Sequence, residues 1–383
     1  MGNKRILIAS SMNGGAEAVA PVANRLLEKG IQCRIFLHGA AERNLRDFKA
    51  APEVLANVSL KECRDIVARF RPTAILTGTQ VQDKDHPRTF EQLLWQVGKE
   101  QSMKTVAVMD TWGNELERFS DLDASSPTPL SAITAPLARL PRIMAILDAY
   151  QEKVMQGLGF SPGALKVTGN PYFEKVAEEF AKLSPATRET LLAKPAFASF
   201  GKSGKLIVFM SDSMSVYPDI GFTETSVLQS FLRAVNELAR TSATQINVII
   251  RPHPFRNQDA ASAFAVVTPG IRKVLHNPVS AKGSDPANDY SMEELLKAAD
   301  VVVGTFNNPL VTAKIVGRPV VHYLPGINPK YEFQKFMSDQ GVSTRVTQAG
   351  MLGVVLEGIL SGRIAQKSMD SVHGAIDRVI ELL

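Results

Sequence analysis

The segment Arg251-Pro252-His253-Pro254 combines two side chains that can bind phosphate with two prolines that fix the backbone. It follows the apolar run 246–251 (INVIIR), so the turn stands at the carboxyl end of a predicted strand. An arginine fork and an imidazole held in such a turn suit an anionic oxygen. A rigid turn whose arginine pairs with a surface carboxylate is the alternative. Two prolines around two phosphate donors favour the binding role, and we expect Arg251 and His253 to contact a phosphate.

A second turn of this kind follows the run 299–304 (ADVVVG). Thr305, Asn307 and Asn308 lie between that predicted strand and a helix predicted over 309–316. We expect these side chains to cap the helix, whose free N–H groups and dipole favour an anion. Ordinary capping alone would explain the residue types. Paired with the first turn, the segment indicates a pyrophosphate cradle in the second half of the chain.

Ser211 and Ser213 follow the strand predicted over 205–210 (KLIVFM). Their hydroxyls and backbone N–H groups can bind phosphate, although a plain polar loop explains them equally well. Both are therefore candidate phosphate-binding residues.

The strands predicted in the first half also end in polar or small residues. Ser11, Gly14 and Gly15 follow the first strand, where the two glycines permit close approach to a ligand or simply form the turn. His38 ends the second strand. Asp110 follows a later apolar strand and is the best-placed carboxylate for a general base, with a capping role as the alternative.

Two D-x-D spacings occur, at Asp83 and Asp85 and at Asp121 and Asp123. Paired carboxylates of this kind can hold a divalent metal on a pyrophosphate. Both pairs fall in polar loops, and the spacing arises often by chance. We predict no metal and no cofactor.

Several common catalytic motifs are missing from the sequence. It contains no G-x-G-x-x-G, G-x-x-x-x-G-K-[ST], H-E-x-x-H or G-x-S-x-G segment. The absence of these motifs argues against four enzyme classes: dehydrogenases, P-loop NTPases, zincins and α/β-hydrolases.

Short apolar runs alternate with amphipathic segments along the whole chain, which predicts an α/β protein with parallel sheets. Ligands of such sheets bind beyond the carboxyl ends of the strands. Strands are predicted over 5–10, 33–37, 74–77, 105–109, 142–147, 205–210, 246–251, 301–303 and 319–323, and helices over 16–28, 60–70, 90–99, 149–158, 172–183, 223–238, 291–298 and 309–316.

The segment 167–171 (VTGNP) interrupts the pattern and marks a predicted domain boundary. We expect an N-terminal domain over 1–170 and a C-terminal domain over 171–383, whose last helix packs back on the first domain. A cleft between two such domains is a favoured ligand site. The Ser/Thr/Pro-rich stretch 121–141 is either a loop over that site or a short helical excursion.

Composition narrows the setting of the protein. The 383 residues carry a formal charge of +5, spread as 21 basic and 18 acidic side chains in the first 170 residues and 22 and 20 in the rest. An even spread argues against nucleic acid, but it is compatible with an anionic ligand or with peripheral contact at the inner face of a membrane. Two cysteines and no long apolar run predict a cytoplasmic protein that is neither secreted nor membrane-spanning.

With these elements in order, the chain resembles the GT-B superfamily, in which two Rossmann-like domains face across a cleft and the second binds a nucleotide-sugar. The resemblance rests on 167–171 (VTGNP), 251–254 (RPHP), 293–296 (EELL), 299–304 (ADVVVG) and 317–321 (GRPVV). It covers essentially the whole chain. Each motif is degenerate, so their order and spacing carry the comparison.

The R-P-H-P element is similar to that of UDP-N-acetylglucosamine 2-epimerases, CDP-glycerol glycerophosphotransferases and several surface-polysaccharide transferases. The resemblance implies that Arg251 and His253 contact the donor phosphates, with Thr305, Asn307 and Asn308 beside them. In the donor-binding set we also include three further residues: Ser211, Ser213 and Asn170.

The sequence also departs from these relatives at two segments. Epimerases usually begin with G-T-R-P-E, where this chain has Ala9–Asn13 (ASSMN), and the D-S-G-G or D-Y-S-S loop is replaced by 304–309 (GTFNNP). The CDP-glycerol glycerophosphotransferases carry that loop too. Both departures argue against epimerase chemistry.

The sequence therefore predicts a metal-independent glycosyltransferase that moves a sugar from a nucleotide-activated donor to a surface-glycan or lipid-linked acceptor. Asp110 is the expected base and His253 the expected stabiliser of the leaving group, while Ser11, Gly14, Gly15 and His38 are expected on the acceptor side. Two alternatives stay open: a nucleotide-sugar 2-epimerase or hydrolase, and a non-catalytic binding or scaffold protein on the same frame.

Overall fold

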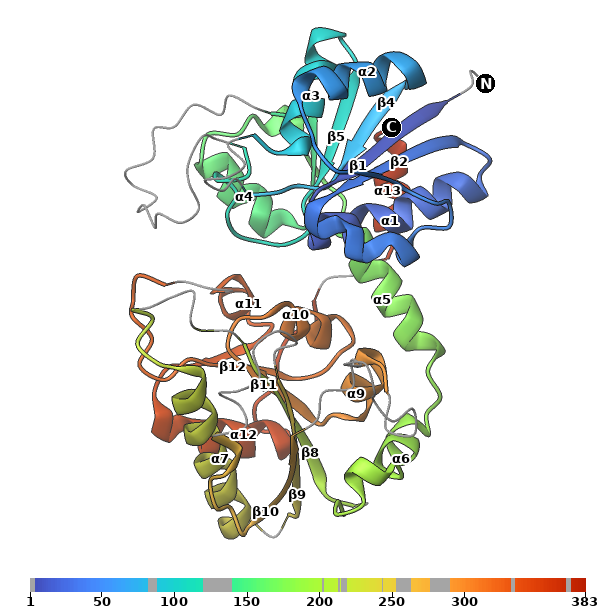
Figure 1. The fold of residues 1–383 in the computed structure, drawn as a ribbon. Coiled ribbons are helices and arrows are strands. Elements are labelled where there is room, and N and C mark those ends of the chain that lie inside the picture. Colours follow the sequence, from blue (N-terminus) through green and yellow to red (C-terminus); the bar gives the residue numbers. More distant parts are fainter. Residues whose placement is uncertain are drawn as a thin grey trace. The chain divides into compact units, whose positions relative to one another are not determined.

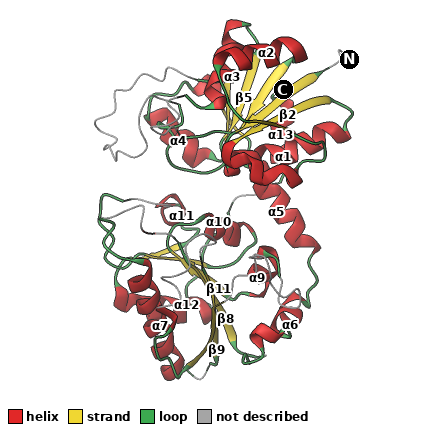
Figure 2. Cartoon of the chain, in the orientation of Figure 1, coloured by secondary structure: helices red, strands yellow, loops and turns green. Residues whose placement is uncertain are grey.

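The chain is divided into two compact units. The computed structural model describes residues 4–81, 88–119, 140–201, 203–212, 214, 219–242, 244–252, 263–275, 290–331, 335–369 and 373–383. Unit 1 comprises Met1–Lys175 and Ser371–Leu383, and unit 2 comprises Val176–Asp370. Each unit is a parallel sheet with helices on its faces (Figures 1 and 2), which confirms the α/β prediction.

Unit 1 has a seven-stranded sheet in the order β3-β2-β1-β4-β5-β6-β7. The order reverses between β1 and β4, so the crevice at their carboxyl ends is the natural ligand position of this sheet. The strands are β1 (Arg5–Ser10), β2 (Gln32–His38), β3 (Glu53–Leu55), β4 (Ala74–Thr77), β5 (Lys104–Val108), β6 (Ile143–Ile146) and β7 (Leu165–Val167).

Helices cover both faces of this sheet because its central strands are apolar on both sides. Ile6 and Ile8 of β1 pack in one cluster with α1 and α13, and Leu7 and Ala9 pack in the other with α2 and α3. The helices are α1 (Asn13–Glu28), the 3-10 helix η1 (Gly39–Asp47), α2 (Leu60–Phe70), α3 (Phe90–Glu100), α4 (Ala149–Gly157), the 3-10 helix η3 (Pro162–Ala164), α5 (Pro171–Lys182) and α13 (Ala375–Glu381).

Unit 2 has a six-stranded sheet in the order β10-β9-β8-β11-β12-β13, which reverses between β8 and β11. Phe209 and Val303 face α7 and α12 in the main core cluster of this unit. Its strands and helices are β8 (Lys205–Met210), β9 (Ile246–Arg251), β10 (Ile271–Leu275), β11 (Val301–Gly304), β12 (Val320–Tyr323), β13 (Thr344–Val346), α6 (Thr187–Leu192), α7 (Glu224–Thr241), α9 (Met292–Ala298), α10 (Asn308–Ile315), α11 (Lys335–Asp339) and α12 (Leu352–Leu360), with the 3-10 helices η4 (Pro195–Phe197) and η7 (Ala349–Met351).

The C-terminal helix α13 belongs to unit 1 and packs against α1. Glu174, near the start of α5, accepts hydrogen bonds from the backbone N–H groups of Gly374 at 2.6 Å and Ile376 at 2.7 Å. Arg378 Nε donates to the carbonyl of Thr168 at 2.9 Å. The division between the units therefore falls inside α5, after Lys175, and the chain returns to unit 1 at its end.

Candidate functional site

Asp110 follows β5 in unit 1 and forms a buried ion pair. Its Oδ1 accepts a hydrogen bond from Arg118 Nη1 at 2.7 Å, and the side chains are 15% and 6% exposed. The same nitrogen donates to Thr79 Oγ1, just beyond β4, at 2.6 Å. Arg118 thus balances the charge of the Asp110 carboxylate and ties it to the neighbouring strand end.

The first turn of α1 lies against this carboxylate because Gly14 has no side chain. A Cβ at Gly14 would stand 2.1 Å from Asp110 Oδ2. A Cβ at Gly15 would stand 2.7 Å from Ser10 Oγ and 3.2 Å from Gly78 Cα. Both glycines are therefore needed to bring the helix start onto the switch point between β1 and β4. The positive end of the helix dipole also favours a carboxylate at this place.

Ser11 is bound to a buried glutamate that sequence reasoning missed. Its N–H donates to Glu91 Oε1 at 2.8 Å and its Oγ donates to Glu91 Oε2 at 2.6 Å, while Gln80 Oε1 also contacts this hydroxyl. Glu91 is fully buried in the first turn of α3, and burial raises the pKa of its carboxyl. Ser11 is itself buried, so its polar groups hold the β1–α1 loop in place.

Asn170 and His38 also bind backbone groups of unit 1. Asn170 Nδ2 donates to the carbonyl of Asp110 at 2.8 Å, and Asn170 Oδ1 accepts from Tyr172 N at 2.9 Å. His38 Nδ1 lies 2.8 Å from the carbonyl of Leu55, to which it donates. Asn170, which we expected among the donor-binding residues, therefore lies in unit 1 beside Asp110.

The ends of four strands form one row across the sheet of unit 2. Arg251 of β9 is paired with Met210 of β8, Met210 with Gly304 of β11, and Gly304 with His322 of β12. Paired residues of a parallel sheet project to the same face. Since Phe209, Ile250 and Val303 pack on α7 and α12, this row projects to the opposite face.

The Arg251 guanidinium is half-buried, and its Nε has no hydrogen-bond partner among the described residues. Burial lowers the pKa of Arg251, while Tyr290 and Glu293 act in the opposite direction. An arginine nevertheless stays charged in proteins. It is therefore a cation at a strand end that no described side chain neutralises in an ion pair.

The hydroxyl groups near the end of β8 are bonded to acidic side chains. Ser211 Oγ is bonded to the buried carboxylate of Glu224 in the first turn of α7. Thr305 Oγ1 is 3.4 Å from Asp212 Oδ2, to which it donates. Ser211 and Thr305 therefore follow neighbouring strands, β8 and β11, and each hydroxyl already contacts a carboxylate.

Asn307 does not cap α10 with its side chain, so that expectation was wrong. It occupies the N-cap position, but its Nδ2 donates to the carbonyls of Met210 at 3.2 Å and Ser211 at 3.3 Å. Its Oδ1 is buried and has no partner in the described part of the chain. Pro309 has no N–H and Leu310 N donates to the carbonyl of Asn307 at 3.1 Å, so the N–H of the exposed Asn308 is the one left without a side-chain cap in the first turn of α10.

His322 is a buried imidazole beside this turn. Its Nδ1 donates to the carbonyl of Thr305, 2.8 Å away. Burial lowers the pKa of His322 to about 4, so the ring is neutral at pH 7. In the sequence His322 is only one residue of the strand predicted over 319–323, and nothing in that run marks it as functional.

Some predicted residues lie outside the described part of the structure. These are His253, Ser213 and both D-x-D pairs. Among the described residues, no group of three or more His, Cys, Asp or Glu side chains is placed to hold a metal ion. Within the same residues, no helix has the length and apolar character needed to cross a bilayer.

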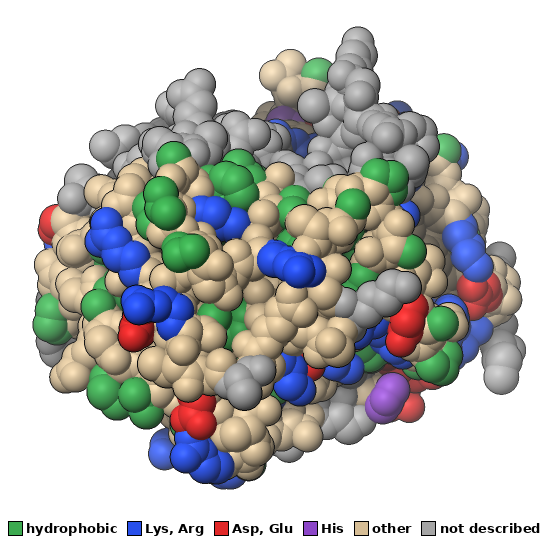
Figure 3. Space-filling view, turned by 90° about the horizontal axis from the view of Figure 1, so that it is seen from below, with side chains coloured by type: hydrophobic (Ala, Val, Ile, Leu, Met, Phe, Trp, Pro, Cys, Tyr) green, Lys and Arg blue, Asp and Glu red, His purple; other side chains and the backbone are tan. Residues whose placement is uncertain are grey.

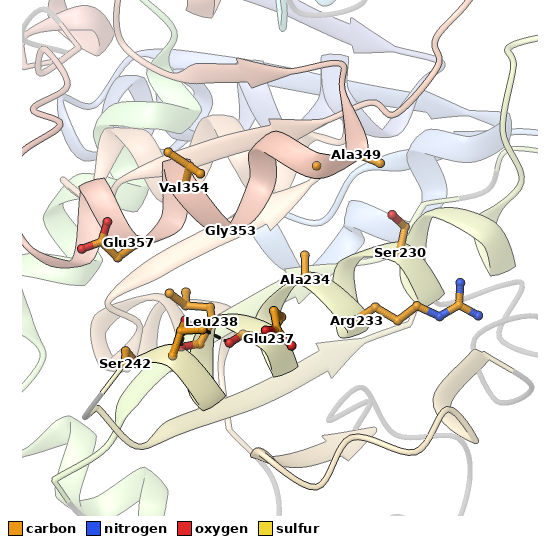
Figure 4. Close-up of a pocket in the computed structure, with 12 residues that line it drawn as sticks. Ser230, Arg233, Ala234, Glu237, Leu238, Ser242, Ala349, Gly353, Val354 and Glu357 are labelled. Carbon is orange, nitrogen blue, oxygen red and sulfur yellow. Dashed lines mark hydrogen bonds between the residues drawn. The ribbon is translucent and has the colours of Figure 1, made fainter.

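A separate cavity of about 720 Å³ lies in unit 2, between α7 and α12 (Figure 4). Its lining includes Ala234 and Leu238 of α7 and Gly353 and Val354 of α12. It is on the sheet face opposite to Arg251, so none of the predicted site residues lines it.

On the face shown in Figure 3, Lys and Arg side chains are spread among acidic and hydrophobic ones, as the even charge distribution predicts.

No protein-family model matches the sequence, and no curated protein matches it. Solved structures do match. UDP-GlcNAc 2-epimerase from Methanocaldococcus jannaschii is 12% identical, with a TM-score of 0.66 over 99% of both chains. The Neisseria meningitidis enzyme bound to UDP-GlcNAc is 12% identical with a TM-score of 0.65, again over 99% of both chains. MurG from Acinetobacter baumannii is 11% identical with a TM-score of 0.57 over 99% of both chains. The chain therefore has the two-unit fold that UDP-GlcNAc 2-epimerases share with GT-B glycosyltransferases.

Proposed function

We propose that the protein is a glycosyltransferase that moves a sugar from a nucleotide-activated donor to an acceptor hydroxyl. The observation that carries this proposal is Arg251, a half-buried cation at the end of β9 with no ion-pair partner among the described residues. Burying a charge without a partner is costly, and a bound phosphate would remove that cost. The fold is consistent with such a donor, because solved structures with this fold include one bound to UDP-GlcNAc.

In this proposal unit 2 binds the donor. The guanidinium of Arg251 and the Asn308 N–H at the positive end of α10 meet the two phosphates, and His253 adds a third donor. Asn307 Oδ1, buried without a described partner, accepts a hydrogen bond from the ligand. Charge that develops on the leaving nucleotide is stabilised by these groups instead of a metal ion.

Unit 1 supplies the base in the same proposal. Asp110 takes the proton of the acceptor hydroxyl, while Arg118 holds the carboxylate in position. Gly14 allows the carboxylate to lie at the start of α1, where the helix dipole offsets part of its charge. Glycans and lipid-linked sugars are the acceptors that we favour, since both offer neutral hydroxyl groups.

The test is a product assay on the purified protein. UDP-, CDP- and GDP-sugars are incubated with and without glycan acceptors, and both free nucleotide and glycosylated product are measured. Asp110→Asn is expected to lower turnover by about 100-fold or more while donor binding persists. The matched control is Asp65→Asn, at an exposed position of α2, which is expected to keep full turnover. Full turnover by Asp110→Asn would show that Asp110 is not the base.

A nucleotide-sugar 2-epimerase is the second candidate. The epimerase structures have higher TM-scores, 0.66 and 0.65, than the 0.57 of MurG. The same assay distinguishes the candidates, because an epimerase changes the sugar or releases nucleotide with no acceptor present. A new sugar isomer in the acceptor-free reaction would favour epimerisation. Nucleotide binding without turnover under every acceptor condition would favour the non-catalytic alternative.

A further inference from the structure

The first two turns of α1 bring a second carboxyl group close to Asp110. Gly14 lies against the Asp110 carboxylate, and Glu17 follows on the same helix face, because residues three apart are neighbours there. Asn13 Nδ2 donates to Glu17 Oε1 at 3.1 Å, which orients the Glu17 side chain. Glu17 is half-buried and feels the negative charge of Asp110.

The two carboxyl groups have opposite surroundings. Asp110 is bonded to Arg118 at 2.7 Å. Glu17 has no ion pair with any described residue, and Lys175, whose charge acts on its carboxyl, is bonded to Asp47 at 3.3 Å. Burial, followed by the charge of Asp47, raises the pKa of Glu17 to about 7, with a smaller contribution from Asp110.

The charged groups facing Glu17 come from three elements around α1. Asp47 ends η1, Asp110 follows β5 and Lys175 lies in α5. The other charged residues of α1, among them Glu28, pair at the far end of the helix with Lys49 and Asp377. Glu17 is therefore the carboxyl of this helix that can change its charge beside Asp110 near neutral pH.

When two neighbouring carboxyl groups lose their protons at different pH values, one can be protonated while the other is ionised, so the two can have different roles in one site. We propose that Glu17 is a positioning residue that acts through Asp110: ionised Glu17 strengthens Asp110 as a base, and protonated Glu17 weakens it. The inference rests on the proposed function, because it assigns Asp110 the proton of the acceptor hydroxyl. That proton moves to the Asp110 carboxylate as the hydroxyl oxygen bonds to the sugar and the nucleotide leaves with its electron pair. Glu17 itself exchanges a proton only with solvent.

The first arm of the test needs no substrate. Unfolding by denaturant is followed from pH 5 to pH 8 for the wild type and for Glu17→Gln. Glu17 is more easily ionised in the unfolded chain, so its contribution to the wild-type stability falls as the pH rises toward 7, and the variant lacks this contribution. The measured quantity is the difference between the two stability curves, because other groups such as His322 titrate in the same way in both proteins. Glu28→Gln, at an exposed position near the end of the same helix, is expected to keep the wild-type slope. Identical slopes for the wild type and Glu17→Gln would overturn the proposal whatever the activity.

The second arm is the pH profile of turnover. The wild type is expected to gain about threefold to tenfold in kcat/KM through pH 7, because the negative charge of ionised Glu17 makes the Asp110 carboxylate a better proton acceptor. Glu17→Gln is expected to show a flat profile at the lower level, and Glu17→Asp to recover part of the rise. A rise that survives in Glu17→Gln would overturn the proposal. No transfer by the wild type at any pH would instead reject the proposed function, and the stability arm would still decide whether Glu17 titrates near neutral pH.

Discussion

Asp110 and Gly14 are in direct contact: a Cβ on Gly14 would stand 2.1 Å from Asp110 Oδ2. The contact joins the start of α1 to the end of β5, two strand positions away from β1 in the sheet. Because Arg118 holds the other oxygen of the same carboxylate, Asp110 is fixed from two sides. The Asp110 carboxylate is therefore held in place by an arginine on one oxygen and a helix start against the other.

Gly14→Ala is therefore expected to damage the site. The added methyl group must displace the carboxylate or the helix start, at a cost of about 1–3 kcal/mol in the free energy of unfolding. Turnover is expected to fall with it, as Asp110 moves. Denaturant unfolding and the transfer assay measure the two effects. Gly157→Ala is the control, since nothing lies within 4 Å of a Cβ there. Equal stability and activity for the two variants would show that the contact is not tight.

Arg118→Met tests the buried ion pair. The variant leaves the Asp110 carboxylate buried without its cation, and we expect a loss of about 3 kcal/mol in the free energy of unfolding. The control is Arg64→Met, which removes the exposed pair with Glu100 at 2.9 Å and is expected to leave stability unchanged. An Arg118→Met protein as stable as the control would contradict the pairing.

His322 is expected to make the protein sensitive to acid. Its pKa is about 4 in the folded protein and 6.5 in an exposed chain, so the unfolded state binds the proton first. Stability from this group is present above pH 6.5 and is lost as the pH falls toward 4, by about 3 kcal/mol in total. Asn keeps a donor toward Thr305, and His322→Asn should lack this part of the acid loss. The difference between the two unfolding curves from pH 7 to pH 4 measures it, and parallel curves would contradict the buried neutral ring.

The central strands could be predicted from the sequence, but the edge strands could not. β1, β4, β8 and β9 are continuous apolar runs because both of their faces are covered. The missed strands β3, β7, β10 and β13 are the four edges of the two sheets. Their burial is partial, and three of them have only three residues, so they leave no apolar run to detect.

The strand-end residues could also be predicted, whereas their partners could not. The fold places Arg118 and Glu17 near Asp110, and Glu91 against Ser11. In the sequence all three look like ordinary loop or helix residues. Glu91 follows a capping threonine and resembles any acidic first-turn residue. Glu17 offered a signal, because it is the single charged side chain in the run 14–23 (GGAEAVAPVA). The side chain of Asn307 binds strand carbonyls instead of the helix start, which its residue type alone cannot indicate.

The most direct measurement is thermal stabilisation by nucleotides. The wild type, Arg251→Ala and the control Arg240→Ala, which changes an exposed arginine of α7, are melted with UDP, CDP, CMP, GDP and their sugar or glycerol conjugates. A ligand at about 100 times its Kd should raise the melting temperature on the order of 5 °C. We expect one nucleotide class to do so for the wild type and the control, and not for Arg251→Ala. No shift with any nucleotide, or an equal shift in Arg251→Ala, would contradict a donor site at the end of β9.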